Sequence, residues 1–228
     1  MNIHFADKDV QSIQELHRVF HLHNNITFSI ADVTNLPRNN TAFVSPSNSL
    51  LFMDGGIDHA YSRVMFPGIE QTVKNSVVKL GLGTSKLGRP YLPVGAAMAV
   101  EISYKNTWLI CAPTMYLPQP VTKTRNAYHS MTSILCVLER LPPSTTLVCP
   151  SLCTGYGKMS SAQSAEQMHD AYWDFVVEGR RPSLQESRHP LCCIPTNDVL
   201  QQILQSQPDY YQNSEFKDIP PEHIEKVG

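Results

Sequence analysis

Residues 45–58 read SPSNSLLFMDGGID and follow an apolar run, Thr41 to Val44, that has the composition of a buried strand. Within this stretch lie two adjacent glycines, an asparagine and two aspartates, and the chain then takes on the pattern of a helix. Glycines let a backbone approach a ligand closely, and consecutive N–H groups in such a loop form a cradle for anions. The stretch therefore predicts a ligand-binding loop between a strand and a helix.

A second loop of this kind, PSLCTGYG at residues 150–157, follows another apolar run at 146–149. In open α/β sheets, ligands bind at the carboxyl ends of the strands, so two such loops facing each other indicate a diphosphate. Each glycine pair alone also fits an ordinary tight turn. Asn48 likewise fits a turn residue that caps local backbone, and Asp58 fits an acidic residue in the first turn of a helix.

Short apolar strands alternate with helical periodicity along most of the chain. Strands are predicted at residues 2–5, 26–30, 41–44, 98–102, 108–112 and 146–149, and helices at 10–20, from about 57, and at 67–80, 127–140 and 161–178. This order predicts an α/β fold, a three-layer α/β/α sandwich whose mixed central sheet has about six strands and helices on both faces.

The chain divides into one domain and a tail. We assign residues 1–180 to the sandwich and residues 181–228 to a C-terminal extension that is partly irregular and either packs on the domain or is weakly ordered, because it is rich in Pro, Gln and Ser. One short helix is expected within it, at residues 198–204, and a polar, weakly ordered tail after residue 207.

Composition limits the function classes. The net charge is -2, and no basic run is longer than Arg180-Arg181, so the chain offers no strong nucleic-acid footprint. Apolar runs such as residues 94–100 are far shorter than the roughly 20 residues of a membrane span, and the first residues lack a signal-peptide pattern. We therefore expect a cytoplasmic or other intracellular protein that contacts no membrane and is a monomer.

The six cysteines are scattered in apolar surroundings and include no CxxC pair. A zinc site would require recurrent short spacings with more cysteine or histidine nearby. We therefore expect reduced structural thiols, no metal site and no cofactor.

Taken together, the motifs resemble those of the macrodomain family. The run IADVTNL at residues 30–36 is similar to the family's G-D-I-T-like turn, and Asn48-Ser49 with GGID at 55–58 is similar to its N-A-A-N strand end and glycine loop. The stretch 149–157 resembles the second loop, P-x-I-S-T-G-x-x-G. LPVG at 92–95 and the apolar run at 108–113 resemble the family's glycine turn and following strand, so the likeness covers residues 26–178 in the right order.

The resemblance implies that ADP-ribose, or an ADP-ribosylated acceptor, lies across the top of the sheet. Asp32 would accept from the adenine amino group beside the backbone of Val33, and Asn48 would bind the distal ribose through a carboxamide that both donates and accepts. The ligand-binding residues implied in this way are Asp32, Val33, Asn48, Gly55, Gly56, Ile57, Cys153, Thr154, Gly155, Tyr156 and Gly157.

The spacing from Asn48 to Asp58 resembles that of the MacroD-type ADP-ribosyl hydrolases, in which the aspartate lies near the anomeric carbon of the distal ribose. The resemblance thus implies hydrolysis, with Asn48 and Asp58 as catalytic residues and an oxocarbenium-like transition state. The alternative is a non-catalytic reader of ADP-ribose, in which the same spacing can occur.

This chain departs from the family pattern at several positions. Ser45 replaces the first asparagine of the N-A-A-N motif, and Pro46 and Ser47 replace its alanines. Asp54 stands where glycine is common, either as a structural residue or as a second acid/base candidate. The second loop is one residue shorter, which leaves open whether Tyr156 packs on the distal ribose. A cysteine stands in place of its serine, with no histidine visibly arranged to activate it.

Overall fold

The central sheet has six strands in the order β2-β1-β6-β3-β5-β4. The computed structural model describes residues 1–82, 89–102 and 106–181 of the chain. Strands β1 to β6 span Asn2–Asp7, Ile26–Ile30, Thr41–Ser45, Met98–Ile102, Thr107–Cys111 and Thr146–Cys149. Neighbouring strands pair in parallel, except that β4 at the edge runs antiparallel to β5.

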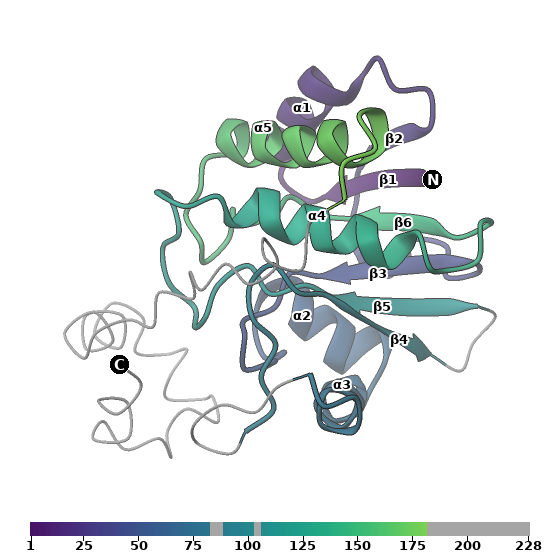
Figure 1. Ribbon diagram of the computed structural model, residues 1–228, viewed down its shortest axis with the longest axis vertical. Helices are drawn as coiled ribbons and strands as arrows, with labels where there is room; N and C mark the ends of the chain where they lie inside the picture. The colour runs from purple at the N-terminus through teal and green to yellow at the C-terminus, as the bar shows by residue number, and fades with distance from the viewer. Residues whose placement is uncertain (83–88, 103–105, 182–228) are drawn as a thin grey trace.

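Five α-helices cover the sheet in the described residues (Figure 1). Helices α1 to α5 span Val10–Phe20, Gly56–His59, Ile69–Lys79, Asn126–Leu138 and Ser161–Tyr172. Two of them continue directly into π-helical segments, α2 into Ala60–Met65 and α5 into Trp173–Val177. Helix α1 begins where the Asp9 carboxylate accepts from the Ser12 backbone N–H at 2.9 Å, which satisfies one of the donors left free in the first turn.

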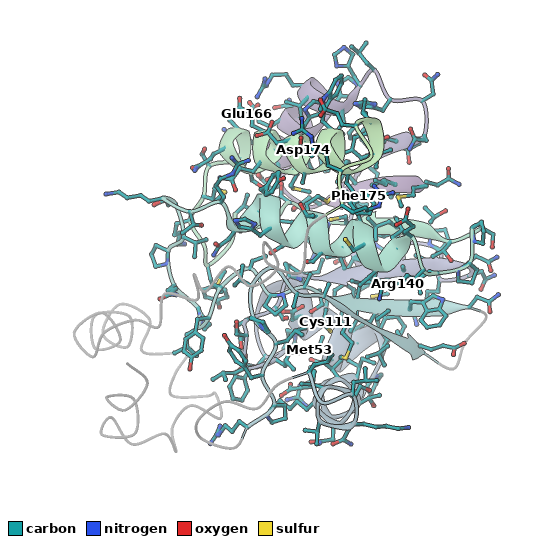
Figure 2. The ribbon with its side chains drawn as sticks, in the orientation of Figure 1. Met53, Cys111, Arg140, Glu166, Asp174 and Phe175 are labelled. Atoms are coloured by element: carbon teal, nitrogen blue, oxygen red, sulfur yellow. The ribbon has the colours of Figure 1, made fainter. Side chains whose placement is uncertain are left out.

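The two faces of the sheet carry separate cores. One joins the sheet to α1, α4 and α5, and the other joins it to α3 and the π-helical segment after α2. Figure 2 labels Phe175 on the α4 and α5 side, and Met53 and Cys111 on the side of α2 and α3. The molecule is therefore a three-layer α/β/α sandwich with a mixed sheet, as predicted.

The parallel arrangement places the carboxyl ends of five strands at the same end of the sheet. Strands β1, β2, β3, β5 and β6 all run in the same direction, so the loops that follow them gather at their carboxyl ends. Both glycine-bearing loops of the sequence are among these, and their strands β3 and β6 are direct neighbours. The two loops that the sequence predicts to bind a ligand therefore lie at the same end of the sheet.

The predicted helix at 198–204 and the tail after residue 207 lie outside the described residues, and the assignment of 181–228 to an extension stays a prediction. Among the helices of the described part of the chain, none has the length and apolar character needed to span a membrane.

Candidate functional site

A cavity of about 450 Å³ lies at the carboxyl ends of the parallel strands and is lined by the loops that follow all five of them. The predicted site residues that line it are Asp32, Val33, Asn48, Gly55, Gly56, Ile57, Asp58, Cys153, Thr154, Gly155 and Tyr156. Residues that lie far apart in the sequence are thus brought to a single cavity.

Gly157 is the one predicted binding residue outside the lining. A Cβ atom at this position would overlap the carbonyl oxygen of Cys153, so the loop cannot fold this tightly around a larger residue. The Gly157 carbonyl accepts from the Val121 N–H at 2.8 Å. Gly157 is therefore required for the tight conformation of the loop.

Asp58 is a buried carboxyl group in the wall of the cavity, only 7% exposed. Its Oδ1 accepts a hydrogen bond of 2.6 Å from the Oγ of Ser45, the last residue of β3. Burial raises the pKa of Asp58 to about 7, the Ser45 hydrogen bond opposes that rise, and the charges of Asp54 and Glu70 add to it. A carboxyl group with a pKa near neutrality can take up or release a proton at the pH of a cell.

The position of Asp58 is fixed by the segment that carries it. The Tyr61 hydroxyl donates to the Val44 carbonyl at 3.1 Å, and Ser62 Oγ donates to the Met53 carbonyl at 2.7 Å. These buried bonds attach α2 and the π-helical segment to β3 and to the preceding loop. Ser45 and Asp58 therefore meet because two neighbouring segments are anchored, which local sequence patterns do not reveal.

Asp54 does not line the cavity, although its charge raises the pKa values of both Asp58 and Tyr156. For Tyr156, burial is the larger cause of the rise. Asp54 is thus close enough to act electrostatically on the cavity wall.

Asn48 is 5% exposed, and its amide holds the loop that it begins. Its Oδ1 accepts from the backbone N–H groups of Leu50 at 3.0 Å and Phe52 at 3.4 Å, and its Nδ2 donates to the Phe52 carbonyl at 3.1 Å. The side chain therefore caps local backbone while lining the cavity. The hydrogen bond to Phe52 uses one of the two N–H groups on Nδ2.

Asp32 lines the cavity just after β2, beside Lys8. Its Oδ2 is 2.6 Å from Lys8 Nζ, and its Oδ1 accepts from the backbone N–H of Thr34 at 2.9 Å and from that residue's hydroxyl at 2.8 Å. The hydrogen bond from Lys8, followed by those from Thr34, lowers the pKa of Asp32 to about 2. Asp32 is therefore a charged acceptor throughout the physiological range.

Cys153 lines the cavity in a left-handed backbone conformation, with φ 66°. Burial raises the pKa of its thiol to about 12, so the thiolate that a nucleophile needs is not formed near neutral pH. The described cysteines, Cys111, Cys136, Cys149 and Cys153, are all free. No cluster of three potential metal ligands occurs within residues 1–82, 89–102 and 106–181.

Sequence patterns missed several residues of the lining, namely Asp7, Lys8, Ser47, Phe52, Thr114, Met115 and Ser151. Some of them follow β1 or β5 in loops that carry no glycine signal. Ser47 and Ser151 are within the recognised motifs, at positions where the motif itself assigns no role. Strand order would have identified the residues that follow β1 and β5, because every loop after a parallel strand reaches the same end of the sheet.

The six-stranded mixed sheet between two helical layers, with glycine loops around a cavity at the carboxyl ends of its strands, has the fold of solved macrodomains. Solved macrodomains match this chain. The macrodomain of Mycobacterium tuberculosis DarG matches at a TM-score of 0.51 and 16% identity, over 65% of this chain and 90% of that one. A glycine-to-valine mutant of the Oceanobacillus iheyensis macrodomain with ADPR matches at 0.51 and 15%, over 78% and 91%.

An asparagine-to-alanine mutant of the same Oceanobacillus protein matches at a TM-score of 0.50 and 16% identity, over 79% of this chain and 87% of that one. No protein-family profile and no curated protein sequence matches the chain. At these identities the likeness establishes the fold.

Proposed function

We propose that the cavity binds ADP-ribose and that the protein hydrolyses the bond between ADP-ribose and a modified acceptor. The observation that carries the proposal is the position of Asp58, a carboxyl group with a pKa of about 7 in the wall of a cavity that Asn48 and both glycine loops also line. Acid–base catalysis works best with a group whose pKa is near the working pH.

The dimensions of the cavity support a nucleotide ligand. Its volume of about 450 Å³ lies within the range of roughly 300–1,000 Å³ that is typical of small-molecule sites. Gly55, Gly56 and Ile57 after β3 and Thr154 and Gly155 after β6 all line the cavity, so both loops bring backbone to its wall. Backbone N–H groups are suitable partners for a diphosphate, which needs donors on several sides.

The chemistry follows from the placement of Asp58. Ionised Asp58 accepts a proton from a water molecule as that water attacks the anomeric carbon of the distal ribose. The bond from this carbon to the acceptor breaks, and the acceptor leaves with the bonding electrons and takes up a proton. The sugar gains oxocarbenium character in the transition state, which the negative carboxylate stabilises. The Asn48 amide orients a ribose hydroxyl.

The comparisons add support. The Oceanobacillus macrodomain structure that matches here contains ADPR. The two matching mutants of this Oceanobacillus protein are separate structures, one with glycine replaced by valine at position 37 and the other with asparagine replaced by alanine at position 30. This difference of seven equals the separation of Gly55 from Asn48. The same two residue types at the same spacing line the cavity of this chain.

A non-catalytic reader of ADP-ribose is the second candidate, and one observation favours it. The Asn48 amide is largely used in holding residues 48–52, which suits a residue that shapes a binding loop as well as one that positions a reacting sugar. A reader needs only the binding part of the site.

Two measurements separate the candidates. Isothermal titration with ADP-ribose tests binding, which both candidates require. A release assay on acceptors that carry mono-ADP-ribose through glutamate, arginine, serine or a nucleobase tests hydrolysis and identifies the linkage. Binding without release from any of these acceptors would establish the reader.

A further inference from the structure

Four buried side-chain atoms in the described residues have no hydrogen-bond partner: Ser47 Oγ, Trp108 Nε1, Thr145 Oγ1 and Ser151 Oγ. Two of these, the hydroxyls of Ser47 and Ser151, belong to residues that line the cavity. Burying a polar group without a partner costs about 1–3 kcal/mol, so each such group in a folded protein calls for an explanation.

The backbones of both serines are held in place. The Ser47 carbonyl accepts from the Thr114 N–H at 2.9 Å, and the Ser151 N–H donates to Asp7 Oδ2 at 3.1 Å. Their loops follow the neighbouring strands β3 and β6, so the two serines approach the cavity from adjacent positions at the sheet edge. The fold thus fixes the main chain at both sites and makes no use of the hydroxyls.

The charges in the cavity lining favour uncharged hydrogen-bond donors for an anionic ligand. Its lining includes the carboxyl groups of Asp7, Asp32 and Asp58, and its one lysine or arginine among the described residues, Lys8, is paired with Asp32 at 2.6 Å. An anionic ligand that enters this surrounding has to be held by uncharged donors. Backbone N–H groups are one kind, and serine hydroxyls are another.

We propose that the hydroxyls of Ser47 and Ser151 donate hydrogen bonds to acceptor oxygens of a bound sugar diphosphate and set the affinity of the cavity for it. The inference rests on the proposed binding of ADP-ribose. In the bound state, each hydroxyl turns about its Cα–Cβ bond from its closed position toward the ligand. Serine side chains move between staggered rotamers at small cost, and the new bond relieves the cost of the unpaired hydroxyl.

The test measures apo stability and ligand affinity together in Ser47→Ala, Ser151→Ala and the double variant. Without ligand, each alanine variant should unfold at the same temperature as the wild type or higher, because it lacks an unpaired buried hydroxyl. Affinity for ADP-ribose should fall about three- to tenfold for each serine, and about tenfold or more for the double variant, as expected for the loss of neutral hydrogen bonds.

Thr145→Val is the matched control. It also removes a buried unpartnered hydroxyl, but Thr145 does not line the cavity. Its affinity for ADP-ribose should equal that of the wild type. ADP serves as a second probe, because a loss that occurs with ADP as well places the contact on the diphosphate, whereas a loss with ADP-ribose alone places it on the distal ribose.

The possible failures are distinguishable. If the wild type binds ADP-ribose and the serine variants bind it equally well, or if Thr145→Val weakens binding as much as they do, the serine assignment is wrong and the proposed function stands. If the wild type binds ADP through the two serines but does not bind ADP-ribose, the proposed function fails and the serine assignment stands. Binding of neither ligand overturns both.

Discussion

Ser45 Oγ and Asp58 Oδ1 lie 2.6 Å apart in a buried hydrogen bond that joins the end of β3 to helix α2. The hydroxyl donates to the carboxyl group and so favours its ionised form, while burial favours the neutral form. Because these two influences oppose each other, Ser45 adjusts the pH at which Asp58 becomes a base.

Removing this donor should shift the pH dependence of turnover. In Ser45→Ala the pKa of Asp58 rises further, so the limb of the pH–rate profile that requires ionised Asp58 should move up by about one pH unit, the equivalent of a hydrogen bond to a charged group. Ser45→Thr keeps a hydroxyl and should retain the wild-type profile. An unshifted profile in Ser45→Ala would assign the limb to another group.

Asp58 should also make folding stability depend on pH. Its pKa is raised from 3.8 to about 7 on folding, so its contribution is fully present below pH 3.8 and is lost as the pH rises toward 7. Asp58→Asn keeps an oxygen for Ser45 but cannot ionise. Between pH 4.5 and 7 the wild type should lose more than about 2 kcal/mol of unfolding free energy relative to this variant. Urea denaturation of both proteins across this pH range measures the difference. If their unfolding free energies change in parallel with pH, folding does not raise the pKa of Asp58.

The two predicted catalytic residues should affect turnover more than binding. Asn48→Ala and Asp58→Ala should each lower the rate of ADP-ribose release by about 10²-fold or more, because positioned groups contribute most in the transition state. Asn48→Ala also removes the cap on residues 48–52, so its unfolding temperature is measured alongside. Asp54→Ala is the control, and a larger rate loss there than at Asp58 would transfer the role of the base to Asp54.

A side chain at Gly56 should interfere with the ligand. Gly56 has φ 56°, and a Cβ there would meet no atom within 4 Å, so the substitution adds backbone strain without a clash. Gly56→Glu should abolish ADP-ribose binding by placing a negative charge on the cavity wall, whereas Gly56→Ala carries the same strain without the charge and should retain measurable binding. Equal affinities of Gly56→Glu and the wild type by calorimetry would contradict the phosphate cradle.

The proposed contact between Asp32 and the adenine predicts a loss of affinity that depends on the ligand. Asp32→Ala should weaken ADP-ribose by about 1.5–3 kcal/mol, as expected for a hydrogen bond to a charged group, and should leave ribose 5-phosphate little changed. Lys8→Met is measured alongside Asp32→Ala, because it removes the ion-pair partner of Asp32 and keeps the Asp32 carboxylate as an acceptor. If both ligands weaken equally in Asp32→Ala, the adenine does not lie at Asp32.

The regular elements could be predicted because their signals are local. Residues 10–20 have helical periodicity and a capping aspartate, and the structure begins and ends α1 at these residues. The two π-helical segments were not predicted, since a single widened turn is too short to be recognised in the apolar periodicity. Residues 161–178 were expected as one α-helix, but the α-helix ends at Tyr172 and a π-helical segment follows it.

Some features of the site could also be predicted from local sequence, and others could not. The local hydrogen bonds of Asn48 were foreseeable, because asparagine side chains commonly bond to backbone a few residues away. The contact between Ser45 and Asp58, the pairing of Lys8 with Asp32 and the place of Ser151 in the lining depend on which strands are neighbours. Strand order comes from the whole fold and has no counterpart in a short motif.

The cavity takes residues from Ala6 to Tyr156, after every parallel strand of the sheet. It can exist only when all five of these strands are in register, because each contributes part of the wall. A bound ligand therefore stabilises the assembled sheet as a unit, and its binding energy is linked to global unfolding. Amide protons in strands as remote from each other as β2 and β5 should exchange more slowly together when the cavity is filled.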